Sequence, residues 1–333
     1  MTINNSSTYI LYTFLTIIIM FAYIQFTSYD NDNENSNDNK KSNINVNYRK
    51  ICKYLITNSS VLHQSKPMLW IHIIYEKNSR KWENFGSRSS SDLNQSYQYL
   101  TIKSILDKCG NTFNICVIDD DTFTTIIPGW TTDLNYVSEP IKGKIRQLAL
   151  AKLLYYYGGI IVPSSFLCKR DLYHTYKEYV KNDTVFVCER NTRSINSSVD
   201  RLSPNPLFMG CTKDNSKMFE FIRFLESYIS SDFTAEGICL DKISSWWVNP
   251  VKMGEANMIP AGYLGMVDSA NNIITLDTLM NDSFINFSDE ALGVYIPSDE
   301  ILSRTAYQWF AALSAKEVLM VENSLGKLLL LSQ

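Results

Sequence analysis

The chain has 333 residues, enough for one large domain or two small ones, and its hydrophobic content of 45% with 13% aromatic residues indicates a globular protein. A formal net charge of −3 gives no electrostatic basis for binding nucleic acid, so no nucleic-acid partner is expected. Seven scattered cysteines without a C-x-x-C pair, and only three histidines, argue against a zinc site. Most cysteines are expected to be small buried residues, and one or two disulfides remain open if the domain is lumenal.

An uncharged apolar segment, Tyr9 to Phe26, follows a short tail of residues 1–8. Its 18 residues, at about 1.5 Å each in a helix, just span a hydrocarbon core of about 30 Å. A cleaved signal peptide is the alternative, but no Lys or Arg precedes residue 40, and bulky side chains stand where a cleavage site needs small ones. The sequence therefore predicts a retained single-pass transmembrane anchor over residues 9–28.

A polar stem is predicted over residues 29–48, because it has too few apolar side chains to pack, and a globular domain over 49–333. Few Lys or Arg residues flank the span, so its orientation rests on analogy with other short-tailed anchors, which places the domain in the lumen or outside the cell. In that topology the candidate N-glycosylation sites are Asn58, Asn94, Asn182, Asn196, Asn281 and Asn286.

Within the domain, apolar runs typical of buried strands alternate with helical patterns. Strands are predicted at 68–75, 113–118, 160–162, 184–188 and 206–211, and helices at 94–109, 122–127, 142–157, 171–181, 215–230 and 235–247. A polar loop is expected over 191–205, short strands and turns over 250–298, and a helical tail over 299–331. This alternation predicts an α/β layer fold with a mostly parallel sheet flanked by helices.

The strongest signal is the segment from Lys142 to Phe166, K-G-K-I-R-Q-L-A-L-A-K-L-L-Y-Y-Y-G-G-I-I-V-P-S-S-F. Its helical part is apolar on nearly every side, which is typical of a buried helix. Gly158 and Gly159 end this helix where a positive φ is expected, and a short buried strand then runs to Pro163. The carboxyl end of such a strand is where α/β folds usually place their chemistry.

The run L-Y-Y-Y-G-G-I-I-V resembles the L-Y-x-Y-G-G-I-Y-x-D-x-D block of the DXD sugar-binding glycosyltransferases, a family of capsular-polysaccharide and mannosyl- or galactosyltransferase-like enzymes. The strand with Trp70, the N-I-C-V-I-D-D strand and the strand at 206–211 follow the family's order over residues 67–250. The Pro-Ser-Ser sequence after the strand also resembles a subgroup of this family from large DNA viruses. Membership of that subgroup would place the protein in a virion or host membrane. The resemblance implies a GT-A-like (Rossmann-like) fold, a nucleotide-sugar donor and a glycan acceptor.

The chain departs from this family where the family binds its metal. The two acids that hold a divalent cation on the donor diphosphate correspond here to Pro163 and Ser165, so Mg²⁺ or Mn²⁺ is not expected, nor is another cofactor. The donor-contacting Asp and Arg of the family helix correspond to Gln147 and Leu150. The sequence thus predicts a glycosyltransferase-like protein that is either a metal-independent transferase or a pseudoenzyme with a binding or structural role at the membrane.

Several polar residues are candidates for a nucleotide-sugar site, each with a structural alternative. The acids Asp119-Asp120-Asp121 could bind a metal, accept ribose hydroxyls through the first two, or cap the next turn. The cations at the start of the central helix could neutralise a diphosphate or form a solvated first turn. The candidate binding residues are Asp119, Asp120, Lys144, Arg146, Ser164 and Ser165.

Other residues are candidates for catalysis or stacking. Glu236 and Asp241 are candidates for the general base that an inverting transferase needs. His72, inside an apolar strand, is expected to be a hydrogen-bonded core residue, with a catalytic role as the alternative. The pair Trp246-Trp247 is expected to pack in the core, with stacking on a sugar ring as the alternative.

Overall fold

A computed structural model of the chain describes residues 66–74, 95–193, 200–231 and 236–333, with only the backbone described at 192–193, 200–201 and 236–241. The predicted anchor, the stem and the candidate glycosylation sites Asn58, Asn94 and Asn196 lie outside the described residues. Within these ranges, none of the helices has both the length and the apolar character required to cross a membrane.

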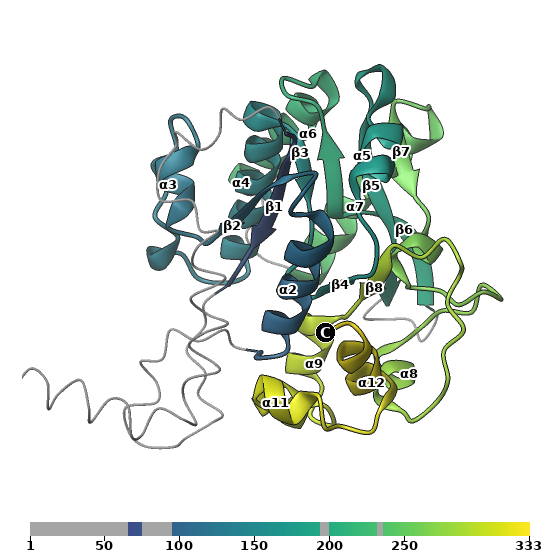
Figure 1. Ribbon diagram of the computed structural model, residues 1–333. Helices are drawn as coiled ribbons and strands as arrows, with labels where there is room; N and C mark the ends of the chain where they lie inside the picture. The colour runs from purple at the N-terminus through teal and green to yellow at the C-terminus, as the bar shows by residue number, and fades with distance from the viewer. Residues whose placement is uncertain (1–65, 75–94, 194–199, 232–235) are drawn as a thin grey trace, which may run out of the picture. The chain divides into compact units, whose positions relative to one another are not determined.

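A six-stranded sheet with the order β2-β1-β3-β6-β5-β7 forms the centre of the domain (Figure 1). β1 pairs in parallel with both β2 and β3, and β5 pairs in parallel with β7, whereas β6 runs antiparallel to both of its neighbours. The predicted α/β fold with a mostly parallel sheet is confirmed, and the arrangement is consistent with a Rossmann-like fold. The strands are β1 (Met68–His72), β2 (Asn114–Ile118), β3 (Gly159–Ile161), β5 (Val185–Arg193), β6 (Asp200–Cys211) and β7 (Ala256–Ile259).

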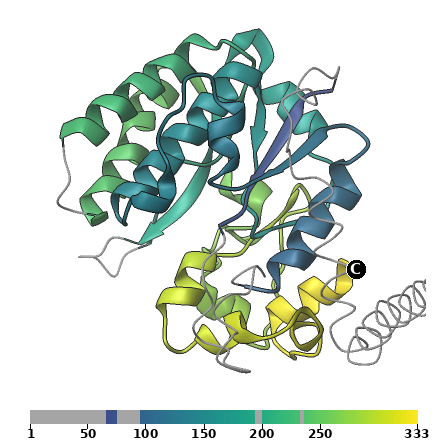
Figure 2. The same cartoon turned by 90° about the vertical axis from the view of Figure 1, so that its left-hand side faces the viewer.

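Helices cover both faces of this sheet (Figure 2). One layer contains α4 (Ile141–Tyr157), α6 (Ser216–Ser231) and α7 (Glu236–Lys252). The other face carries α2 (Gln98–Cys109) and α5 (Tyr173–Tyr179), and α3 (Thr122–Ile126) follows β2 at the sheet edge. Successive residues of β1 point to opposite faces, so Trp70 joins the core beneath α4 while Leu69 and Ile71 are fully buried on the other side.

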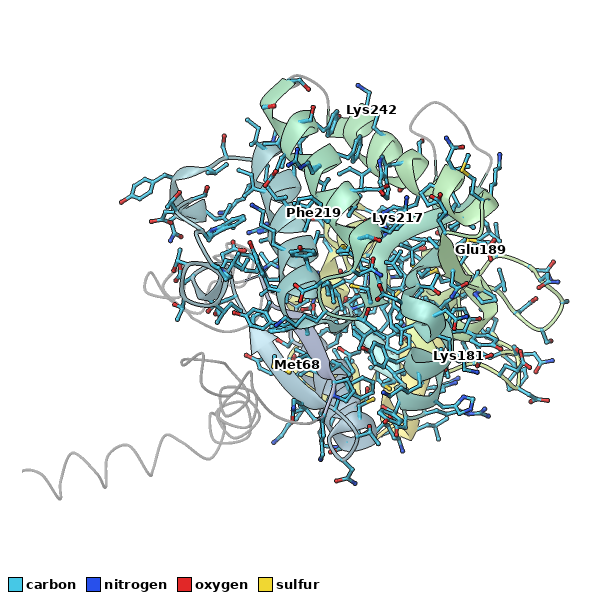
Figure 3. The ribbon with its side chains drawn as sticks, turned by 90° about the horizontal axis from the view of Figure 1, so that it is seen from above. Met68, Lys181, Glu189, Lys217, Phe219 and Lys242 are labelled. Carbon is cyan, nitrogen blue, oxygen red and sulfur yellow. The ribbon has the colours of Figure 1, made fainter. Side chains whose placement is uncertain are left out.

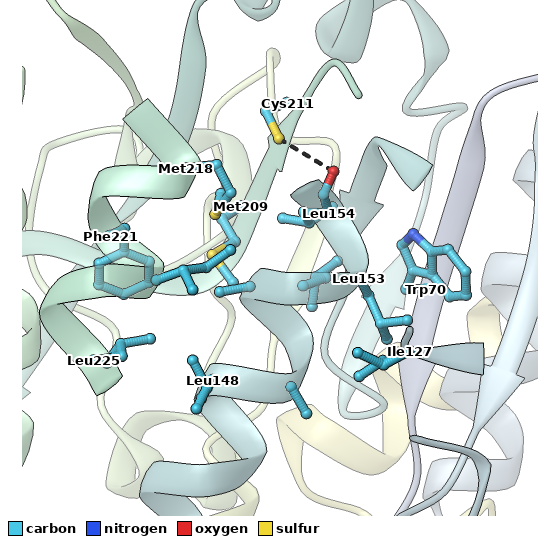
Figure 4. Packing of buried hydrophobic residues seen from close by; sticks show 14 of the residues in the cluster. Trp70, Ile127, Leu148, Leu153, Leu154, Met209, Cys211, Met218, Phe221 and Leu225 are labelled. Atoms are coloured by element: carbon cyan, nitrogen blue, oxygen red, sulfur yellow. Dashed lines mark hydrogen bonds between the residues drawn. The ribbon is translucent and has the colours of Figure 1, made fainter. Parts of the chain in front are cut away.

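The central helix α4 is buried as its sequence predicts. Its residues Leu148, Leu153 and Leu154 pack between the sheet and Phe221 of α6 (Figure 4). Trp70 contributes a fully buried ring to this core, and its Nε1 donates a hydrogen bond of 3.0 Å to the carbonyl oxygen of Gly158. This bond joins the first strand to the turn that ends α4.

Replacing Trp70 with Phe should leave the Gly158 carbonyl without its buried donor. We expect the free energy of unfolding, measured by urea titration, to fall by about 1–3 kcal/mol beyond the loss caused by the smaller ring. Trp247 is a matched control, because it is equally buried but its Nε1 has no hydrogen-bond partner among the described residues. A loss for Trp247→Phe as large as that for Trp70→Phe would contradict this role of the Trp70 hydrogen bond.

A smaller antiparallel sheet of β4 (Phe166–Cys168) and β8 (Gly293–Tyr295) lies beside the main one. It packs with α2 and with a series of short helices around a second core that includes Tyr97, Leu167 and Phe310. The short helices are α8 (Leu276–Met280), α9 (Ser298–Ser303), α10 (Gln308–Ala312), α11 (Ala315–Val318) and α12 (Ser324–Leu331).

The prediction of a polar loop over residues 191–205 is wrong. β5 continues to Arg193 and β6 begins at Asp200, and the two strands pair from Cys188 opposite Asn205 to Arg193 opposite Asp200. Backbone hydrogen bonds between the strands stabilise this ladder, so the apolar alternation that marks a strand in the sequence is not needed. The helical tail is confirmed in type, but it is divided into short helices.

Candidate functional site

The carboxyl ends of β1, β2 and β3 meet at one edge of the sheet, and a cluster of ionisable side chains lies there. His72 Nε2 is 2.9 Å from Asp120 Oδ1. Arg146 of α4 donates from Nε to both carboxylate oxygens of Asp120, at 3.0 and 3.1 Å, and from Nη2 to Oδ2 at 2.7 Å. Its Nη1 donates to Glu139 Oε1 at 3.1 Å. We call these four residues the Asp120 cluster.

The carboxylate of Asp120 is held in its ionised form. Burial raises the pKa of Asp120, but hydrogen bonds and charge from His72 and Arg146 outweigh burial and hold this pKa well below its usual value. The His72 ring also stacks on Phe123, with ring centres 5.2 Å apart, so His72 is the hydrogen-bonded core residue that the sequence predicts. The acceptor oxygens of Asp120 are therefore occupied by donors from the protein itself.

Because of the Asp120 cluster, we expect the folded domain to lose stability in acid. A carboxylate with a depressed pKa contributes stability above its unfolded pKa, and the contribution is lost as pH falls through the folded pKa. Asp277 acts in the same direction, because hydrogen bonds from Arg304 and Tyr307 lower its pKa to about 2. We expect the free energy of unfolding to fall from about pH 5 towards about pH 2, and to fall less steeply in Asp120→Asn. Equal slopes for the variant and the wild type in urea titrations would contradict this assignment.

The neighbouring acids take structural roles. Asp119 Oδ1 accepts hydrogen bonds from Thr122 N at 2.9 Å and Thr122 Oγ1 at 2.5 Å, which stabilises the start of α3. Asp121 Oδ1 accepts a bond of 3.1 Å from Asn135. For Asp119 this geometry corresponds to the capping alternative.

The Pro163-Ser164-Ser165 segment is fastened to the surrounding fold. Ser164 Oγ donates to Gln98 Oε1 at 3.1 Å, and its carbonyl accepts a bond of 2.6 Å from Thr101 of α2. Ser165 is only 2% exposed, and its carbonyl accepts a bond from Ile296 N beyond β8. The position that holds a metal in the family resembled by the sequence is thus packed between α2 and the small sheet.

A cavity of about 210 Å³ lies beside the Asp120 cluster, between the first turns of α4, the strands β5 and β6, and α7. We call it the α4 cavity. Glu139 belongs to both features, because it lines the cavity and pairs with Arg146. Polar lining residues are Glu139, Lys144, Gln147, Arg190, Asn205 and Ser244.

Two cations line the α4 cavity. Lys144 is buried at 3% exposure, with Nζ 4.9 Å from the centre of the Tyr228 ring, so the expected solvated first turn does not apply to this residue. The guanidinium of Arg190 lies 5.2 Å from the centre of the Tyr295 ring and donates a bond of 3.1 Å to Asp299. Each of the two cations therefore contacts an aromatic ring, and Arg190 is also ion-paired with Asp299.

The wall of the cavity carries two cationic side chains and one carboxylate. Gln147 Nε2 is buried without a hydrogen-bond partner among the described residues, and the carboxylate of Glu139 is already paired with Arg146. The volume is below the range of about 300–1,000 Å³ for drug-sized ligands, so it suits a group of the size of a phosphate or a sugar. An anionic or oxygen-rich group is the ligand that this wall fits best.

The residues predicted for catalysis or sugar stacking are not among the described lining residues of the α4 cavity. The side chains of Glu236 and Asp241 lie outside the described residues, although the backbone of α7 that carries them also carries Ser244 at the cavity wall. Trp247 is fully buried and Trp246 packs on Phe221 with ring centres 5.0 Å apart, which agrees with the expected core role. In the described parts of the chain, no group of three or more His, Cys, Asp or Glu side chains is arranged to hold a metal ion.

Sequence reasoning missed Arg190, Asn205 and Ser244 as lining residues. Arg190 lies within β5, two residues after its apolar run, in the sequence C-E-R-N. Charged residues that follow an apolar run were the signal that could have marked it. Asn205 fell in the predicted loop, and Ser244 has no distinctive neighbours in the sequence.

Comparisons with known proteins include a weak structural similarity to a solved structure. The sequence matches no protein-family profile, and no curated protein matches it. Among solved structures, the fold is similar to one titled PaToxG Glycosyltransferase, with 13% sequence identity and a TM-score of 0.30, over 64% of this chain and 80% of that chain. This weak similarity to a glycosyltransferase carries no argument about the site.

Proposed function

We propose that the chain is a membrane-anchored, GT-A-like glycosyltransferase-type protein that binds a nucleotide sugar without a divalent metal and has lost sugar transfer. The observation that carries this proposal is the α4 cavity beside the carboxyl edge of the sheet. Lys144 and Arg190 line it, together with Gln147, whose Nε2 has no partner in the described part of the chain. A diphosphate needs positive charge and donors around it, and Lys and Arg side chains supply both.

The residues at the sheet edge do not fit a metal-bound diphosphate. Hard cations such as Mn²⁺ need carboxylate oxygens, and the family's two acids are replaced here by Pro163 and Ser165. Recruiting Asp120 instead would break its bonds to Arg146 and His72. The structure therefore favours a binding protein of glycosyltransferase type, a pseudoglycosyltransferase, over a metal-dependent enzyme.

A metal-independent transferase is the second candidate, and the same two cations favour it. Positive charge placed at a leaving diphosphate stabilises the transition state of sugar transfer as a metal does. The general base would be Glu236 or Asp241 on α7, and the acceptor would be a glycan. The two candidates differ in one observable, which is the formation of a sugar product.

The proposed anchor over residues 9–28 places the domain in the lumen or outside the cell. The candidate glycosylation sites Asn182, Asn281 and Asn286 are exposed, as glycan attachment requires. We expect the full-length chain made in eukaryotic cells to fractionate with membranes and to lose mass on treatment with an N-glycosidase. A soluble, unglycosylated product would contradict this topology.

Binding can be tested with UDP-glucose and GDP-mannose as probes and with UDP and GDP alone. We expect Lys144→Met and Arg190→Gln each to weaken binding of the preferred probe at least tenfold in EDTA, because each removes a charged contact worth about 1.5–3 kcal/mol. Lys242→Met is the matched control, since Lys242 contacts the same Tyr228 ring at 5.2 Å but lies exposed on α7 (Figure 3). Unchanged affinity in Lys144→Met and Arg190→Gln would refute the α4 cavity as the site.

A further inference from the structure

Two buried cysteines face each other where α2 contacts β4. Figure 1 labels these two elements. Cys109 is the last residue of α2 and Cys168 is the last residue of β4, and both are fully buried. Their Sγ atoms are 3.9 Å apart, although the residues are separated by 59 positions in the sequence. This contact is independent of the α4 cavity and of the proposed function.

The backbone on either side of this contact is held in place without the sulfurs. Ser104 Oγ of α2 accepts a hydrogen bond of 2.9 Å from Cys168 N, and Cys168 pairs with Gly293 in the small sheet. The carbonyl of Cys109 accepts a bond of 3.0 Å from Phe113 N. A disulfide has an S–S distance of about 2.05 Å, so the two sulfurs would need to approach each other by roughly 2 Å.

Cys168 Sγ also donates to the carbonyl oxygen of Arg170 at 3.0 Å, and the other described thiols have only contacts of this second kind. The sulfurs of Cys116, Cys188 and Cys211 contact backbone carbonyl oxygens, at 3.6, 3.2 and 3.6 Å. Among the described cysteines, only Cys109 and Cys168 form a thiol–thiol contact. Folding under oxidising conditions should therefore select this pair among the described cysteines.

We propose that Cys109 and Cys168 form a disulfide that fastens α2 to β4 when the domain folds in an oxidising compartment. The two thiols together lose two protons and two electrons to a disulfide oxidant such as glutathione disulfide, which is reduced to two thiols. Because both sulfurs are buried, the exchange takes place before α2 docks on β4. In a reducing compartment the same pair remains as two thiols.

The bond would reinforce the region that replaces the metal-binding acids. Thr101 of α2 holds the carbonyl of Ser164, and β4 begins directly after Ser165. A covalent link between α2 and β4 therefore fixes both elements that hold Pro163-Ser164-Ser165. It also closes a long loop in the unfolded chain, which lowers the entropy of the unfolded state.

Peptide mapping of the full-length chain, folded in a glutathione redox buffer, tests this inference. Trypsin should release Cys109 in the peptide 109–142, which also contains Cys116, and Cys168 in the peptide 153–169. The mapping is therefore done on Cys116→Ala as well as on the wild type. We expect a cross-linked pair of these peptides under non-reducing conditions in both proteins, and its disappearance after reduction.

Thermal unfolding gives a second readout. We expect oxidation to raise the Tm of the wild type by about 5–10 °C and reduction to reverse the increase, whereas Cys168→Ala should show no redox-dependent change. Cys188→Ala, an equally buried cysteine outside the pair, should keep both the cross-link and the shift. Free thiols at Cys109 and Cys168 after oxidative folding, or a disulfide from either one to another cysteine, would overturn the proposal. The mapping does not depend on whether Cys168→Ala folds.

Discussion

Replacing Gly159 with alanine is expected to prevent stable folding, with a loss in the free energy of unfolding of about 4 kcal/mol or more. Gly159 has a φ of +99°, and a Cβ atom there would lie 2.1 Å from the carbonyl oxygen of Met68 and 2.8 Å from its carbonyl carbon. Both of these atoms belong to the backbone of β1, so no side-chain rotation can relieve the overlap. Relief would require moving β3 away from β1 in the middle of the sheet. Soluble yield and urea titration measure the effect.

Gly129 is the matched control for this substitution. It also has a positive φ, of +71°, but a Cβ atom there would have no atom within 4 Å. Gly129→Ala should therefore cost only the strain of the left-handed backbone, about 1–2 kcal/mol. If the two alanine variants lost equal stability, the close approach of β3 to β1 would not be the cause.

Replacing Arg146 with Met should lower the free energy of unfolding by about 3 kcal/mol, because it leaves the carboxylate of Asp120 with only His72 as a partner. The side chains of Arg146 and Asp120 are 11% and 19% exposed, so solvent replaces the lost donors only in part. Urea titration at neutral pH measures this loss. Because Arg146 no longer depresses the pKa of Asp120, the variant should lose less stability than the wild type as the pH falls.

Two further variants separate the ion pair from general damage. Glu139 is the exposed partner of Arg146, at 51%, so Glu139→Gln should cost less than about 1 kcal/mol. Adding Asp120→Asn to Arg146→Met should recover part of the lost stability, because the unpaired charge is removed. Additive losses in the double variant would show that Arg146 and Asp120 do not act together.

The sequence predicts best those parts of the fold that depend on local signals. The apolar run of α4, the glycine pair and the short strand after it lie within one segment, and the structure has each of them where the pattern places it. The β5–β6 hairpin was missed because polar strands held by backbone pairing lack apolar alternation. β4 was missed because it has three residues and depends on β8, far along the chain.

The candidate site was harder to predict, because its properties come from contacts between distant segments. Asp120 and Arg146 were both candidates, but their separate sequence positions do not show that each occupies the other. Lys144 and Arg190 meet at one cavity only because β5 lies beside the first turns of α4 in the folded domain. Neither pairing has a signature in the sequence.

Isothermal titration calorimetry of the full-length chain with UDP-glucose and GDP-mannose, in EDTA and again in Mn²⁺, tests the central claim most directly. We expect one of these probes to bind with the same affinity in both conditions. The solution recovered from the calorimeter should contain no free sugar and no glycosylated product. Binding that requires Mn²⁺, together with release or transfer of the sugar, would contradict it.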